Sequence, residues 1–73
     1  MRKSSPSLLN LARYVERIWL EAVFEDSPNA TVLRTVLDAV TRKEGSMALE
    51  ICRKNGLGNY LEGQISKNFA VSP

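Results

Sequence analysis

Residues Leu8 to Phe24 read LLNLARYVERIWLEAVF and form the longest amphipathic segment of the chain. Apolar residues recur in it every three or four positions, which is the spacing that lines one face of a helix. The members of this stripe are Leu8, Leu11, Ala12, Val15, Ile18, Trp19, Ala22 and Val23. We therefore predict an amphipathic helix with one buried face, and an all-α fold, a compact bundle of about four helices, that buries it.

The composition indicates one small domain without metal-binding or membrane features. The chain has 73 residues, a single cysteine and no histidine, so it cannot form an internal disulfide and has few donors for a zinc site. No apolar run approaches the ~20 residues that cross a bilayer, and no stretch has the pattern of a secretory signal. We expect a cytoplasmic protein with no membrane partner.

Serine–proline pairs predict the starts of the first two helices. Ser5-Pro6 is expected to begin a helix that runs to about Phe24, and Ser27-Pro28 to supply the N-cap and first position of the next. Apolar residues between Val32 and Val40 recur with helical periodicity, and Gly45 is predicted to stop this second helix.

Two shorter helices are predicted in the C-terminal half. Ser46 is expected to cap a helix from Met47 to about Lys54, and Asn55-Gly56-Leu57 fits a Schellman motif with glycine in the left-handed conformation. Asn59 and Glu62 fit a capping box, in which an N-cap side chain pairs with a carboxylate three residues later, and open the last helix.

Both ends of the chain are predicted to lie outside the helices. Residues 1–5 form a flexible N-terminal arm, and residues 67–73 a flexible C-terminal tail. In this tail, Phe69 and Val71 either dock on the core or stay free for a partner. Residues 1–73 are therefore predicted to form a single small helical domain with two flexible ends.

No set of residues is typical of an active site. Histidine, the commonest general base, is absent, and Cys52 lies at an inward helical position where a buried structural thiol is expected. Glu25 and Asp26 are adjacent, but the serine and proline that follow indicate turn and cap roles. We expect no enzyme activity, no cofactor, no metal and no small-molecule substrate.

Residues 51–66, ICRKNGLGNYLEGQIS, have the pattern of a degenerate helix-turn-helix, with a glycine turn between two helices. They resemble the C-terminal part of helix-turn-helix antidote proteins of toxin–antitoxin modules, although the turn before Leu61 is one residue shorter. The resemblance implies a DNA-binding repressor as an alternative function. The residues that would contact DNA are Arg53, Lys54, Asn59, Tyr60, Gln64 and Lys67. Glu62 in the middle of the second helix weighs against this alternative, because phosphates repel a carboxylate.

The first helix carries another candidate surface on its outer side. Leucine, phenylalanine and arginine lie together there, a combination that is enriched in protein interfaces. The candidate partner-binding residues are Leu9, Arg13, Arg17, Leu20 and Phe24, joined by Arg2 and Lys3 of the N-terminal arm. Two alternatives stay open: the apolar members lie under the other helices, or they form a homodimer interface.

In size and general character the chain resembles the small phage-encoded proteins that bind host RNA polymerase. Such proteins inhibit the initiation of transcription or alter its termination. The resemblance implies a non-enzymatic regulator that acts through protein–protein contacts, with RNA polymerase as the candidate partner. The DNA-binding repressor of the antitoxin type is the alternative, and a structural or assembly subunit is a third hypothesis.

Overall fold

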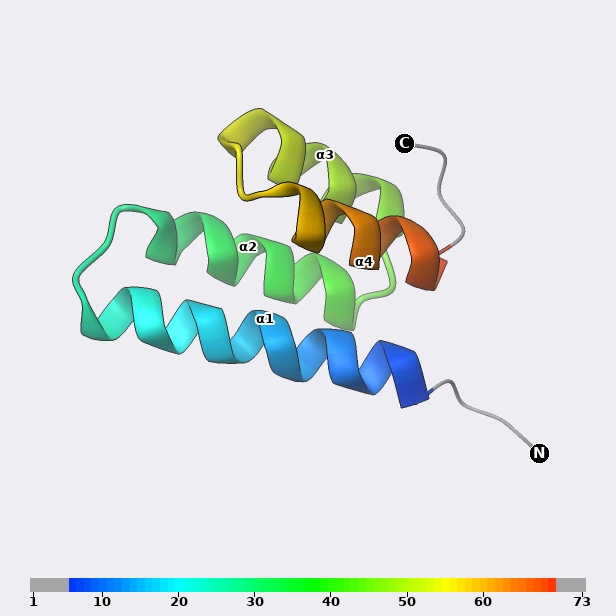
Figure 1. The fold of residues 1–73 in the computed structure, drawn as a ribbon, viewed down its shortest axis with the longest axis horizontal. Helices are drawn as coiled ribbons and strands as arrows, with labels where there is room; N and C mark the ends of the chain where they lie inside the picture. The colour runs from blue at the N-terminus through cyan, green and yellow to red at the C-terminus, as the bar shows by residue number, and fades with distance from the viewer. Residues whose placement is uncertain (1–5, 70–73) are drawn as a thin grey trace.

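The computed structural model describes residues 6–69, and the predicted all-helical fold is confirmed for them. Four helices make up the described chain: α1 (Pro6–Phe24), α2 (Asn29–Thr41), α3 (Gly45–Asn55) and α4 (Asn59–Phe69) (Figure 1). Within this range 84% of the residues are helical and none lies in a strand. The predicted arm at residues 1–5, with Arg2 and Lys3, and the predicted tail from residue 70 onward, with Val71, lie outside the described residues.

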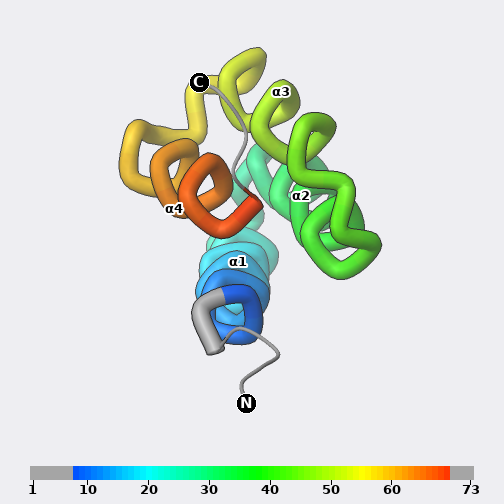
Figure 2. The backbone as a smooth tube through the Cα atoms, turned by 90° about the vertical axis from the view of Figure 1, so that its right-hand side faces the viewer, coloured from blue at the N-terminus to red at the C-terminus, as the bar shows by residue number. Residues whose placement is uncertain are grey.

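Successive helices run in opposite directions, so the chain passes back and forth along the bundle (Figure 1). Helix α1 packs against α2 and α4, and α3 packs against the same two helices, with no direct packing of α1 on α3 in the described chain. A view along the bundle shows α1 at one edge, below the other three helices (Figure 2). One side of α1 is consequently left without a helix against it.

The core is built from apolar side chains of all four helices, as the periodicity of each segment predicts. Its buried members are Leu11, Val15, Ala22, Leu33, Val36, Ala39, Val40, Ala48, Leu49, Cys52, Leu61 and Ile65. Val23 was predicted to join them, but half of its surface is exposed. The reason is geometric: Ala22 takes the inward position of the last turn of α1, and the next residue points about 100° away from it.

The predicted Schellman motif at the end of α3 is confirmed. Gly56 has φ 59° and ψ 47°, and its amide donates to the Arg53 carbonyl. The Leu57 amide donates to the Cys52 carbonyl over 3.1 Å, which completes the two-bond pattern of the motif. Glycine suits this position because it has no Cβ to oppose a positive φ.

Helices α1 and α2 end in the same way, but without glycine. The left-handed positions are taken by Asp26, with φ 56°, and Lys43, with φ 62°. The following amides, of Ser27 and Glu44, each donate over 2.8 Å to a carbonyl of the preceding helix. The prediction that Gly45 stops the second helix is therefore wrong, because Lys43 makes the turn and Gly45 already belongs to α3.

Helix starts agree with the sequence only in part. Helix α2 begins at Asn29 with Pro28 as its N-cap, one residue later than predicted, and the Ser27 Oγ still accepts from the Asn29 amide over 3.2 Å. Ser46 does not cap α3, which begins one residue earlier and whose first acceptor is the Glu44 carbonyl. Asn59 does not cap α4 either, because the Glu62 amide donates to the Gly58 carbonyl.

Helix α4 is longer than predicted and runs through Phe69, so residues 67–69 are helical and are not part of a tail. Phe69 docks on the core, which answers the alternative left open for this residue. It lies against Gly45 at the start of α3. This contact between distant parts of the chain holds the last turn of α4 in place.

Candidate protein-binding surface

One side of α1 carries seven exposed residues, which we call the outer face: Leu9, Arg13, Glu16, Arg17, Leu20, Val23 and Phe24. At about 100° per residue, these positions lie opposite the buried Val15 and Ala22. The outer face therefore points away from the buried side of α1, which lies at one edge of the bundle in Figure 2. All five described residues of the predicted partner-binding set belong to it.

The apolar residues of the outer face are not covered by the other helices. Leu9 and Leu20 are 55% and 51% exposed, and Phe24 is 92% exposed. The alternative in which they lie under α2 and α4 is therefore wrong. Leu20, Val23 and Phe24 follow the i, i+3, i+4 spacing that makes them neighbours on the helix surface. They form an apolar cluster at the C-terminal end of α1.

Charged side chains separate this cluster from Leu9. Arg13 and Glu16 form no ion pair within residues 6–69, where Arg34 and Asp38 make the one pair present. The Arg17 guanidinium carbon lies 5.6 Å from the centroid of the Tyr14 ring, close enough for a cation–π interaction. Arg13 and Glu16 thus keep their charges available to a partner.

The outer face continues into a shallow groove of about 470 Å³ between α1 and α2. Its walls are formed by Leu9, Ala12, Arg13 and Glu16 of α1, and by Arg34, Leu37, Asp38 and Thr41 of α2. Apolar side chains therefore line part of the groove and charges surround them.

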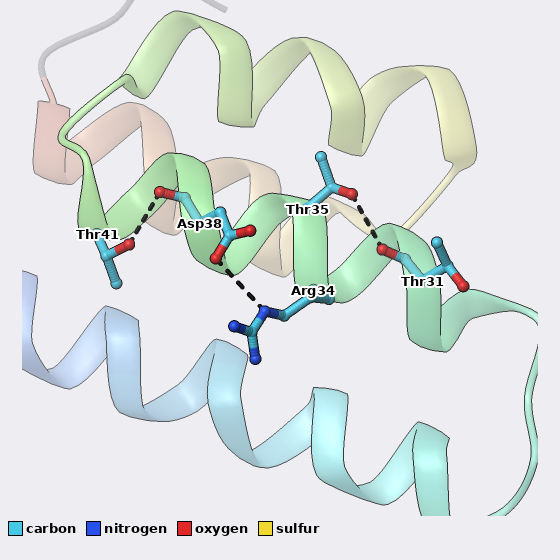
Figure 3. A network of polar contacts seen from close by, with 5 residues as sticks. All are labelled: Thr31, Arg34, Thr35, Asp38 and Thr41. Atoms are coloured by element: carbon cyan, nitrogen blue, oxygen red, sulfur yellow. Dashed lines mark hydrogen bonds and ion pairs between the residues drawn. The ribbon is translucent and has the colours of Figure 1, made fainter.

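The α2 wall of this groove is held by short polar contacts (Figure 3). Arg34 Nε lies 3.4 Å from Asp38 Oδ1, and the Thr41 hydroxyl donates to the Asp38 carbonyl over 2.9 Å. The Arg34 guanidinium carbon also lies 5.0 Å from the Trp19 ring centroid, so this arginine bridges α1 and α2. Ion pairing and stacking together restrict its side chain.

The residues of the DNA-binding alternative fall on more than one side of the molecule. Arg53, Asn59 and Lys67 line a second groove, of about 350 Å³, between α3 and α4. Tyr60 instead faces α1, with its ring centroid 5.4 Å from that of Tyr14 and an interplanar angle of 72°. Lys54 is exposed at the end of α3 outside this groove.

Two further observations bear on this alternative. Gln64 is half-buried, and its backbone carbonyl accepts from the Asn68 amide nitrogen Nδ2 over 2.8 Å. Helices α3 and α4 form a hairpin that runs back on itself (Figure 1), and the helix-turn-helix stays a prediction. Glu62 lines the α3–α4 groove next to the cations and lowers its net positive charge.

Cys52 is fully buried, as the sequence predicted. Loss of hydration raises the pKa of its thiol to about 11, and the negative charge of Glu62 acts in the same direction. Such a thiol is protonated at neutral pH and is a poor nucleophile. In the described part of the chain, no three side chains of the metal-binding types come together. Between residues 6 and 69, no helix combines the length and apolar character needed to span a bilayer.

Glu16 and Val23 belong to the outer face but were not among the predicted site residues. Helical spacing could have placed Glu16 there, because it lies one turn before Leu20. Val23 was assigned to the buried stripe. Comparisons of the chain with known protein families, with curated proteins and with solved structures find no match.

Proposed function

We propose that the protein is a cytoplasmic, non-enzymatic regulator that binds a protein partner through the outer face of α1. The observation that carries this proposal is the exposure of Leu20 and Phe24 beside Arg13 and Arg17. Interfaces are enriched in aromatic residues and arginine, and exposed apolar clusters mark interaction sites. RNA polymerase is the proposed partner because the chain resembles, in size and general character, the small phage-encoded proteins that bind it. Modulation of the initiation or termination of transcription is the proposed outcome.

The outer face contributes little to folding, which supports a role in binding. The core is complete without Leu9, Leu20 or Phe24, since the buried side chains of α1 lie on its opposite side. An exposed phenylalanine gains no burial in the monomer, but it would gain about 1.5–3 kcal/mol if a partner buried it fully. Phe24 therefore has more to contribute to an interface than to the fold.

The charges of the outer face indicate the chemistry of the partner surface. Arg13 and Arg17 outnumber Glu16, so an apolar pocket flanked by carboxylates would be complementary. A guanidinium can pair with a carboxylate through two hydrogen bonds, and Arg13 has no such partner in the described chain. The groove beside Leu9 offers room for a side chain of the partner.

The test is a pull-down of the tagged protein from a nuclease-treated cell lysate, followed by binding to purified RNA polymerase. We expect polymerase subunits to be retained at moderate salt, and Phe24→Ala to weaken binding by about tenfold or more. Met47→Ala is the matched control, because Met47 is a half-exposed apolar residue on α3. Normal binding by the Phe24→Ala protein would overturn the assignment of the outer face.

A DNA-binding repressor is the second candidate, and the shared groove of Arg53, Asn59 and Lys67 is the observation that favours it. This candidate predicts retention of DNA from an untreated lysate in a salt-sensitive manner. Arg53→Ala and Lys67→Ala should then weaken binding to all sequences and lower the salt dependence, whereas Asn59→Ala should change sequence preference. If polymerase binds and none of these three changes weakens that binding, only the protein-binding proposal stands.

A further inference from the structure

Four residues form a straight row along the centre of the outer face: Leu9, Arg13, Glu16 and Leu20. Their separations alternate between four and three positions, which is the spacing of residues at the seam of a coiled coil. All four side chains are exposed, and α1 lies at one edge of the bundle (Figure 2). From this row we infer that two copies of the chain pair through α1 in antiparallel orientation.

The row is complementary to itself when one copy is turned by a two-fold rotation. The midpoint between Leu9 and Leu20 is also the midpoint between Arg13 and Glu16, and it falls between Tyr14 and Val15. In an antiparallel pair centred there, each Leu9 lies opposite the Leu20 of the second copy. Each Arg13 likewise lies opposite the second copy's Glu16. The interface therefore has two ionic layers at its centre and an apolar layer at each end, and it is isologous.

Charge selects the antiparallel arrangement over the parallel one. In a parallel pair the same residues would face each other, so Arg13 would oppose Arg13 and Glu16 would oppose Glu16. Like charges placed directly opposite are repulsive. Arg13 and Glu16 form no ion pair within the described part of one chain, so both charges are available to the second copy.

The surroundings of the row leave space for a second helix. Leu9, Arg13 and Glu16 also border the groove between α1 and α2, which Leu37 lines from the α2 side. Leu20 of the second copy, lying opposite Leu9, would approach the mouth of this groove. The pairing thus buries apolar surface at both of its ends as well as joining charges at its centre.

The test is sedimentation of the purified full chain over a range of concentrations. We expect a reversible monomer–dimer equilibrium, weakened about tenfold or more by Arg13→Glu and by Glu16→Arg, because each places like charges opposite each other. The double variant R13E/E16R should dimerise like the unaltered chain, since its charges are exchanged but still complementary. Mixing the two single variants should give a heterodimer in which both charge pairs join opposite charges.

Glu50→Arg is the matched control, because it reverses an exposed charge on α3 and should leave the equilibrium unchanged. Orientation is tested with Leu9→Cys and Leu20→Cys. Under oxidation the two should form a disulfide with each other in a mixture and form none alone, whereas a parallel pair would cross-link each variant with itself. Cys52 is buried and does not compete. The inference would be overturned by a chain that stays monomeric, or by a dimer that neither Arg13→Glu nor Glu16→Arg weakens.

This dimer does not depend on the proposed binding of a partner, although both use the outer face and would exclude each other. The double variant R13E/E16R and the variant Phe24→Ala separate the two, because each keeps the complementary charge pairs of the dimer and removes a residue proposed to contact the partner. Phe24 lies outside the four layers. A dimer that persists when polymerase binding is lost therefore distinguishes the dimer from the binding of a partner.

Discussion

Gly45 and Phe69 touch where α3 begins and α4 ends. A Cβ added to Gly45 would lie 2.5 Å from both Cβ and Cγ of Phe69. These two atoms are at the root of the side chain, so rotation of the ring alone cannot relieve the overlap. Gly45 is thus required for the close approach of α4 to α3.

Replacement of Gly45 by alanine should lower the free energy of unfolding by about 1–3 kcal/mol, because the added methyl group overpacks the contact with Phe69. Urea denaturation followed by circular dichroism measures the change. Gly63→Ala is the matched control, since a Cβ there meets nothing within 4 Å. That change should raise stability by up to about 1 kcal/mol through helix propensity alone. Equal effects of the two substitutions would contradict the proposed packing role.

Lys43→Gly should stabilise the protein by about 1 kcal/mol. Lys43 has φ 62°, a left-handed conformation that is unfavourable for a residue with a Cβ, whereas glycine adopts it without that penalty. The reciprocal change, Gly56→Ala, should destabilise by a similar amount, because Gly56 has φ 59° in the same motif. Thermal unfolding of the two variants beside the parent checks both signs. If Lys43→Gly instead destabilises the protein, the Lys43 side chain stabilises the fold by more than its left-handed backbone conformation costs.

The sequence predicts the four helices well because their signals are local. Periodicity places the buried residues of α1, and the turn at Gly56 follows from the conformational freedom of glycine. The role of Gly45 could not be predicted in the same way. It depends on Phe69, a residue far along the chain, and sequence reasoning offers no means of knowing that the two meet.

The candidate surface could likewise be predicted from the sequence only in part. Helical spacing alone groups Leu9, Leu20 and Phe24, but only the packing of the other helices shows that they remain exposed. The contact between Tyr14 and Tyr60 likewise depends on which helices are neighbours. It separates Tyr60 from the other residues of the DNA-binding alternative, a result that spacing within α4 could not have shown.

Cys52 should make stability fall at alkaline pH. Its thiol has a pKa of about 11 in the folded chain, against roughly 8.5 in an unfolded one. The unfolded state therefore loses this proton first, and the contribution of the protonated thiol is complete below about pH 8.5 and declines up to about pH 11. The slope is at most about 1.4 kcal/mol per pH unit.

Urea titrations at a series of pH values measure this decline. Cys52→Ala is the control, because it has no thiol and leaves every other side chain of the protein unchanged. Its stability should be lower at pH 7, owing to the smaller side chain in the core, and should fall less steeply above about pH 8.5. Parallel curves for the two proteins would contradict the raised pKa.

Polar substitutions on the outer face should leave folding intact. Leu20→Ser and Phe24→Ser are expected to change the free energy of unfolding by no more than about 0.5 kcal/mol, because both side chains already face water. Val15→Ala, on the opposite side of the same helix, should cost about 2 kcal/mol, since Val15 is completely buried. The difference between the two sides is measured by urea denaturation at a protein concentration low enough to keep the chain monomeric. It tests whether one side of α1 stabilises the fold while the other side is free to bind a partner. A loss of more than about 1 kcal/mol on either serine substitution would show that the outer face supports the monomer's own structure.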